Sequence, residues 1–219
     1  RLHSSAVQRR LPAFAHAGDQ CLALFADIYA TGALVFPHGA RVLEIGCSEA
    51  DWLTPMLALR PDLETIGIDW RRCGRPGTVL KGAVLQQQFQ SKSFDAVVGI
   101  SSIEHIGLGH YRNGDGESND PFDVDGDTHT MQRCAQWLKP DGWMYCDVPY
   151  QPDAYEVIGT ECRVYNDLAI ANERGDINEQ SIGFRVVADE WFDDKGSPSD
   201  RMVGTKRLIT EINLNKGDV

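Results

Sequence analysis

The chain has 219 residues, 42% of them hydrophobic, which is enough to bury one substantial core and is close to the upper size of a single domain. Its net charge of -11 argues against the clustered basic surface that phosphate-backbone binding requires, so we expect no nucleic-acid partner. No apolar run approaches the roughly 20 residues of a membrane span, so we expect no membrane span, and the first residues do not have the pattern expected of a signal peptide.

The six cysteines are scattered along the chain without a CxxC pair, and several of them lie in apolar segments. This distribution is typical of reduced, buried thiols rather than of a disulfide framework or a zinc site. We therefore expect a protein of a reducing compartment, and we predict that it is cytoplasmic.

The first 40 residues are predicted to form a helical lead-in, because residues 11–29 carry apolar positions at helical spacing. The chain then turns at Gly46, from a strand into a helix that begins near residue 51. Five short apolar runs are predicted as strands interleaved with helices, at residues 42–45, 63–69, 78–80, 94–100 and 143–149.

The C-terminal third is predicted to add two more strands, at residues 183–192 and 205–214, after a helix near residues 165–172. An earlier helix at residues 128–138 stops at a Lys-Pro-Asp-Gly turn signal. This order predicts an α/β, Rossmann-like, doubly wound fold: one domain over residues 1–219, whose mostly parallel sheet has an antiparallel edge strand.

Residues 113–127 form a long loop rich in Gly, Asp and Asn, and loops of this length are usually functional or disordered. Its carboxylates suggest a hard divalent cation, with Asp125 and Asp127 as weak candidate ligands. However, the loop fails the calcium-binding pattern, because Gly126 is misplaced and no closing Glu follows. The alternative is a solvated loop in which Asp127 caps the helix that follows.

Small residues follow the first predicted strand, at Gly46, Ser48 and Ala50, where the chain enters a helix. They allow a tight turn and a close approach of ligand to backbone, and the helix start presents free N–H groups. Asp69 ends the second strand, where a carboxylate can accept both hydroxyl protons of a ribose. Each residue alone also has a structural explanation, but their order on consecutive strands favours a ligand of the adenosine type.

These segments resemble the class I S-adenosylmethionine-dependent methyltransferases over roughly residues 41–149. Their first motif is matched at residues 44–50, their second at Asp69 and Trp70, their fourth at "SFDAVVGISSIEHI", and their fifth strand at "LKPDGWMYCDVP". The stretch "SSIEHIGLGHY" is similar to a group of small methyltransferases whose acceptors are largely unassigned. The resemblance implies a seven-stranded sheet and S-adenosylmethionine as the methyl donor. The implied cofactor-binding residues are Glu44, Gly46, Cys47, Ser48, Ala50, Asp69, Trp70, Ala83, Val84 and Ser101.

Two departures from the family pattern affect this site. Ser48 and Ala50 stand where the family usually has glycine, and their Cβ atoms narrow the approach to the methionine end. The acidic residue often found after the third strand is missing, which leaves Ala83 and Val84 to offer backbone N–H groups and apolar contact. These departures keep open an alternative function, a non-catalytic binding or scaffold domain of a larger assembly.

Methyl transfer is an in-line displacement, so the enzyme must hold the acceptor atom beside the methyl carbon. His105 is the candidate general base for a hydroxyl acceptor, and Glu104 is expected to orient it or bind the acceptor. The alternative is that this Glu-His pair only caps and packs the turn. Tyr111, His129 and Tyr150 are candidate acceptor contacts.

The sequence favours an O-methyltransferase acting on a small-molecule or glycan acceptor, because hydroxyl-dense ligands need the many polar partners found after the fourth and fifth strands. A nicotinamide-dependent oxidoreductase would share the ribose carboxylate, but it prefers the GxGxxG spacing that this chain lacks. The acceptor, the oligomeric state and the need for a divalent cation stay open.

Overall fold

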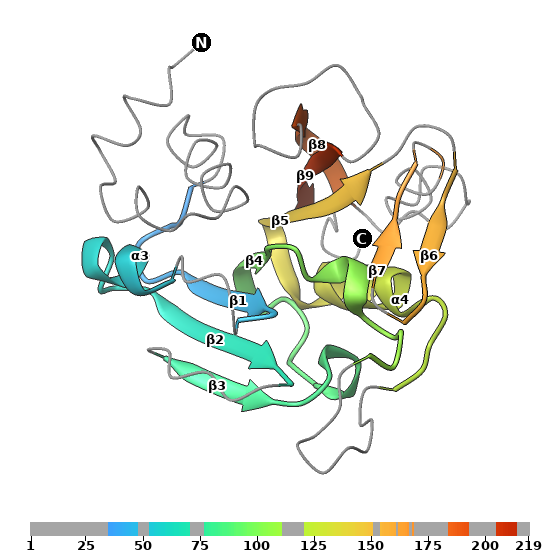
Figure 1. The fold of residues 1–219 in the computed structure, drawn as a ribbon. Helices are drawn as coiled ribbons and strands as arrows, with labels where there is room; N and C mark the ends of the chain where they lie inside the picture. The colour runs from blue at the N-terminus through green and yellow to red at the C-terminus, as the bar shows by residue number, and fades with distance from the viewer. Residues whose placement is uncertain are drawn as a thin grey trace, which may run out of the picture.

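The computed structural model describes residues 35–47, 53–70, 77–110, 121–150, 154–160, 162–166, 168, 184–192 and 205–213. Its main sheet has the strand order β3-β2-β1-β4-β5-β9-β8 (Figure 1). The strands are β1 (Arg41–Ile45), β2 (Glu64–Asp69), β3 (Thr78–Lys81), β4 (Phe94–Gly99), β5 (Leu138–Tyr150), β8 (Phe184–Phe192) and β9 (Thr205–Asn213). The predicted α/β, Rossmann-like class is confirmed.

The pairing differs from the prediction at one edge of the sheet. Strands β1 to β5 pair in parallel, but β9 is antiparallel to both β5 and β8 and lies between them. The antiparallel strand is therefore one place inside the edge, and β8 at the edge runs parallel to β5. A period-2 pattern predicts that a segment is a strand but not which strand it joins, so the sequence left this order undetermined.

Strands are added in one direction from β1 and in the opposite direction from β4, which makes this parallel pair the switch point of the sheet. From β1 the chain passes through α3 (Leu53–Leu59) to β2, and from β4 it passes through α4 (Gly126–Trp137) to β5. These crossovers step away in opposite directions, so right-handed connections place the two helices on opposite faces. In open α/β sheets, ligands bind at the carboxyl ends of the strands at such a point.

The central strands have continuous apolar sequences because both of their faces are buried in the core. Val42, Leu43, Ala96, Val97 and Val98 are fully buried on neighbouring strands, as expected for parallel strands covered by helices on both faces. From α4, Met131 and Cys134 belong to one cluster with Leu43 and Val97. Burial raises the pKa of the Cys134 thiol, which keeps it protonated.

The predicted turn at residues 139–142 lies inside β5. Phe94 pairs with Leu138 and Ala96 with Trp143, so a step of two residues on β4 corresponds to five on β5, and residues 139–142 bulge out of the ladder. Lys139 Nζ donates to Asp95 Oδ2 at 2.8 Å, and the same oxygen accepts the Arg41 N–H at 2.8 Å. One carboxylate thus joins the starts of β1 and β4 to the bulge.

A second, two-stranded antiparallel sheet follows β5 and was not predicted. It consists of β6 (Glu156–Ile158) and β7 (Cys162–Val164), and it lies beside α4 (Figure 1). Most of the predicted helix at residues 165–172, the N-terminal lead-in and residues 113–120 of the acidic loop lie outside the described residues. No helix in the described part of the chain is long and apolar enough to cross a membrane.

Candidate functional site

Gly46 marks the carboxyl end of β1 and adopts a left-handed backbone conformation with φ of +75°. Its N–H donates to the Ile68 carbonyl of β2 at 2.9 Å. A Cβ atom at this position would overlap Ser102 Oγ and would lie 2.8 Å from Ser102 Cβ. The turn after β1 therefore touches the turn after β4, and both the backbone angle and the contact require glycine.

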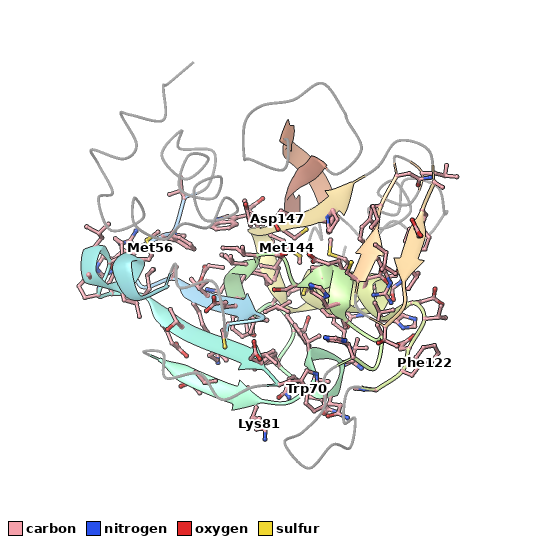
Figure 2. All side chains as sticks on the ribbon, viewed as in Figure 1. Met56, Trp70, Lys81, Phe122, Met144 and Asp147 are labelled. Atoms are coloured by element: carbon pink, nitrogen blue, oxygen red, sulfur yellow. The ribbon has the colours of Figure 1, made fainter. Side chains whose placement is uncertain are left out.

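The ends of β2 and β3 meet at the same edge. Asp69 pairs in register with Lys81, is 6% exposed, and its carbonyl accepts the Gly82 N–H at 3.0 Å. Trp70 lies just past the end of β2 (Figure 2). Beyond Gly82, Ala83 and Val84 are buried as the 3-10 helix η2 (Val84–Gln86) begins.

Two further predicted cofactor residues lie on and just after β1. Glu44 is 3% exposed within the strand, and Cys47, directly after the Gly46 turn, is 1% exposed. The Cys47 N–H lies 3.4 Å from the same Ile68 carbonyl that Gly46 contacts. Ser48 and Ala50, the two departures from the family pattern, lie outside the described residues.

A cluster of three polar side chains follows β4. The Ser101 hydroxyl donates to Glu104 Oε1 at 2.8 Å, and His105 Nε2 lies 3.8 Å from the same oxygen. Glu104 is buried, at 1% exposure, whereas the His105 side chain is 27% exposed. The 3-10 helix η3 (Ile103–His105) holds both side chains, and the His105 N–H donates to the Ser102 carbonyl at 3.2 Å. The imidazole thus lies at the surface of the turn, with a buried carboxylate beneath it.

Asp147 supports this cluster and was not recognised from the sequence. It is fully buried near the end of β5, and its Oδ1 accepts the Ser101 N–H at 2.7 Å (Figure 2). Ser101 has a φ of +46°, which is unfavourable for any residue with a Cβ, so this hydrogen bond supports a strained backbone. Tyr145 donates its hydroxyl proton to Asp147 Oδ2 at 3.3 Å. The only signal in the sequence was a carboxylate inside an apolar strand.

The three predicted acceptor contacts, Tyr111, His129 and Tyr150, lie on separate segments of the chain. Tyr111 lies outside the described residues, and Tyr150 is described only by its backbone, which pairs with Thr205. His129 lies on α4, half-exposed, with Nδ1 2.7 Å from Asp123 Oδ2.

His129 also lines a groove of about 820 Å³ between α4 and the segment that follows β3. Other side chains of this groove are Gln86, Gln88, Phe89, Phe122 and Arg133. Figure 2 shows Phe122 on the side of the molecule away from Met56 of α3. Its lining combines amide groups with aromatic rings.

The weak metal prediction is not supported. Asp127 is buried, with Oδ2 lying 3.1 Å from Arg163 Nε and accepting the Tyr165 hydroxyl at 2.6 Å, so this carboxylate is used inside the protein. Burial raises the pKa of Asp127, and the contacts with Arg163 and Tyr165 oppose part of that rise. Asp125 precedes α4 without a side-chain capping hydrogen bond. Among the described residues, no three metal-ligating side chains gather at one place.

Solved structures with the same architecture come from several proteins. An S-adenosylmethionine-dependent methyltransferase of Methanosarcina mazei matches with a TM-score of 0.58 and 12% identity, over 86% of this chain and 98% of that one. The 1,6-didemethyltoxoflavin-N1-methyltransferase of Burkholderia thailandensis, solved with S-adenosylhomocysteine, matches with a TM-score of 0.58 and 14% identity, over 91% and 79%. The [4+2]-cyclase SpnF matches with a TM-score of 0.57 and 13% identity, over 86% and 81%. At these identities the likeness establishes the fold.

The family follows from the sequence itself. A profile described as a methyltransferase domain matches residues 15–197, most of the chain, whereas no curated protein sequence matches it. The chain belongs to the class I S-adenosylmethionine-dependent methyltransferases. For this methyltransferase, S-adenosylmethionine is the cofactor, and Gly46 and Asp69 lie at the carboxyl ends of the neighbouring parallel strands β1 and β2, where open α/β sheets bind their ligands.

Proposed function

We propose that this methyltransferase transfers the methyl group of S-adenosylmethionine to a hydroxyl oxygen of a small-molecule or glycan acceptor. The observation that carries the proposal is the cluster of Ser101, Glu104 and His105, which follows β4 beside the Gly46 turn. A partly exposed imidazole at the end of a central strand is suited to accept a proton from an acceptor hydroxyl.

The cofactor is proposed to bind across the carboxyl ends of β1, β2 and β4. In this arrangement the Asp69 carboxylate accepts the ribose hydroxyl protons, and the backbone at Gly46 and Cys47 lies against the methionine portion. Ala83 and Val84 contact the adenine, and Trp70 and Ser101 flank the same edge. S-adenosylmethionine supplies an electrophilic methyl group, so the protein's main task is to align the acceptor oxygen with it.

The acceptor is proposed to lie over the turn after β4. His105 takes the hydroxyl proton, and the buried Glu104, whose Oε1 lies 3.8 Å from Nε2, is proposed to keep the imidazole oriented. Tyr111, Tyr150 and His129 are the proposed acceptor contacts. The groove beside His129 offers amides for hydroxyl groups and rings for apolar sugar faces, which supports a polyhydroxylated acceptor.

Titration with S-adenosylhomocysteine tests the cofactor half of the proposal. Asp69→Ala should weaken binding by about 1–3 kcal/mol, or roughly 5- to 140-fold in Kd, because the ribose hydroxyls lose a carboxylate partner. Glu64→Ala is the matched control, since Glu64 begins the same strand at its opposite, exposed end. Equal affinity of the Asp69→Ala and Glu64→Ala variants would contradict the placement of the ribose.

An acceptor screen tests the chemistry, with release of S-adenosylhomocysteine as the signal. Matched panels of hydroxyl and amine acceptors, including mono- and oligosaccharides, should give turnover with hydroxyl compounds. His105→Ala should slow this turnover about 10²–10⁴-fold while leaving cofactor affinity unchanged. Turnover with amines alone would show a nitrogen acceptor, as the name of the Burkholderia thailandensis protein states for that enzyme. Tight cofactor binding without turnover in either panel would favour the scaffold alternative.

A further inference from the structure

Arg163 is a fully buried cation at the centre of β7, outside the main sheet. Its side chain is 0% exposed and is the largest of the fully buried side chains in the described part of the chain. A buried guanidinium is costly unless its charge and its N–H groups find partners. The partners of Arg163 therefore show which segments of the chain the small β6–β7 sheet contacts.

Those partners belong to two segments that are distant in sequence. Nη1 donates to the Ile106 carbonyl at 2.6 Å and makes a longer contact with the Glu104 carbonyl, both in the turn after β4. Nη2 donates to the Val124 carbonyl at 3.0 Å, just before α4. Nε lies 3.1 Å from the Asp127 carboxylate in the first turn of α4. One planar cation thus joins the turn that carries His105 to the start of α4.

The two segments also meet directly, backbone against backbone. The Asp123 N–H donates to the Gly107 carbonyl at 2.8 Å, and Leu108 forms an isolated bridge with Phe122. A Cβ atom on Gly126 would lie 2.9 Å from the Gly107 Cα. Residues 106–108 and 122–126 therefore form a narrow neck, and Arg163 lies across its carbonyl groups.

Tyr165, two residues after Arg163, contacts the same carboxylate. Its hydroxyl donates to the Asp127 carboxylate at 2.6 Å, and its backbone N–H donates to the Pro149 carbonyl at 2.9 Å. The Arg163–Asp127 pair is therefore anchored to the end of β5 as well as to α4. Lysine could keep the charge at position 163 but not a planar fork that reaches both sets of carbonyls.

We propose that Arg163 is a positioning residue for methyl transfer, which locks the His105 turn to the start of α4 and so fixes where the imidazole lies. The inference rests on the proposed role of His105 as the base. In this arrangement Arg163 does not touch the cofactor or the acceptor. It holds the Glu104 and Ile106 backbone on either side of His105, so loss of the fork lets the imidazole move while the Gly46 and Asp69 edge stays in place.

Hydrogen exchange on the full chain tests this lock without an acceptor. In Arg163→Lys, amides of residues 104–108 and 123–126 should exchange at least tenfold faster, with strands β1 and β4 unchanged. S-adenosylhomocysteine affinity should stay within threefold. Arg163→Met combined with Asp127→Leu removes the pair without leaving a buried unpaired carboxylate, and it should show the same local pattern if the single variant does not fold. Arg60→Met is the matched control, because Arg60 makes the same kinds of contact, with the Phe36 and Pro37 carbonyls and the Asp62 carboxylate, away from the neck.

Three outcomes would overturn the inference. Amide exchange at the neck could stay unchanged, or exchange could become equally faster throughout the sheet. Alternatively, S-adenosylhomocysteine affinity could fall by the same factor as the protection of the neck amides. The first outcome would mean that Arg163 does not fix the turn after β4 to the start of α4. The other two would mean that Arg163 stabilises the whole fold and not this turn in particular. With an acceptor from the screen, Arg163→Lys should lower kcat at least tenfold at an unchanged KM for S-adenosylmethionine. If His105→Ala keeps full turnover while the exchange pattern appears, the proposed base is wrong and the lock still stands.

Discussion

Gly46 combines two constraints that can be separated by mutation. Alanine there would carry both an unfavourable positive φ and an overlap with Ser102, whereas Gly39 has a similar φ of +68° and nothing within 4 Å of an added Cβ. Gly39→Ala should therefore cost about 1–2 kcal/mol of unfolding free energy from the backbone alone. Gly46→Ala should cost clearly more, measured by urea unfolding, and should also weaken S-adenosylhomocysteine binding.

A double variant isolates the contact between the two turns. Gly46→Ala combined with Ser102→Gly removes the overlap and leaves the backbone strain, so its stability loss should approach that of Gly39→Ala. If the two single glycine variants lose equal stability, the contact between the turns after β1 and β4 has no energetic role, and the close approach described for the site is wrong.

Asp147 supports the turn that carries His105. Asp147→Ala leaves the Ser101 N–H without its buried acceptor, so we expect a loss of about 1–3 kcal/mol in unfolding free energy. Because Ser101 then lacks support for its positive φ, turnover should fall more than cofactor affinity does. Tyr145→Phe, which removes only the 3.3 Å contact to the same carboxylate, is the control and should cost less. Equal effects of both variants would rule out the Ser101 contact as the reason.

Among single residues, the site residues at strand ends could be predicted from the sequence, but the buried residues that support them could not. Gly46, Asp69 and His105 each follow an apolar run, so their shared edge could be predicted from the order of strands alone. Asp147 and Arg163 act on partners 46 and about 57 residues away, and nothing local marks such a pair. Asp127 looked like a loop carboxylate open to a metal because its partner Arg163 lies on a strand too short to be predicted.

Among the strands, those that are buried on both faces could be predicted from the sequence, and the short exposed ones could not. Strands β1, β2 and β4 are buried on both faces, so their apolar runs are unambiguous. By contrast, β6 is exposed along its whole length and only three residues long, which leaves no periodic signal. The predicted turn at residues 139–142 is a bulge within β5, because these residues lie inside the strand and pairing with β4 resumes immediately after them.

The segment before β1 is held by an ion pair whose strength depends on pH. Arg60 donates to Asp62 and to the Phe36 carbonyl, and Asp62 accepts the Gly39 N–H at 2.8 Å. The hydrogen bonds from Arg60, and then that from Gly39, hold the pKa of Asp62 well below its usual value. A carboxyl group whose pKa is lowered by folding stabilises the native state above its unfolded pKa and loses that contribution as pH falls.

Asp62→Asn should therefore lower the Tm at neutral pH. The difference from the unchanged protein should begin to shrink below about pH 4, near the pKa of a free aspartate, and should continue to shrink toward the lowered pKa of folded Asp62. Thermal unfolding between pH 3 and pH 7 measures this. Glu156→Gln, at an exposed residue of β6, controls for the change in net charge. A Tm difference that stays constant across this range would show that Asp62 acts through shape and not through its charge.

For the whole molecule, the order of the sheet predicts that folding depends on β9, the strand nearest the C-terminus. β9 pairs with β5 from Trp143↔Ile212 to Tyr150↔Thr205 and separates β5 from β8. Residues 138–150 therefore have no second neighbour in the sheet until residues 205–213 have been made and docked. The pairing of β5 with β9 joins segments that are far apart in the sequence, and such long-range pairing is slow to form.

Truncation tests this dependence. Ending the chain after residue 204 would expose the backbone of β5 along an edge that contains the buried residues Met144, Tyr145 and Cys146. We expect loss of the cooperative thermal transition and association in size-exclusion chromatography, because a long apolar edge strand pairs with other chains. Ending the chain after residue 213 keeps β9 whole and is the matched control, which should melt cooperatively. Since β8 runs parallel to β5, it could pair with β5 directly when β9 is absent. A monomeric, cooperatively melting chain of 204 residues would show that it does, and that β9 is not required to close the sheet.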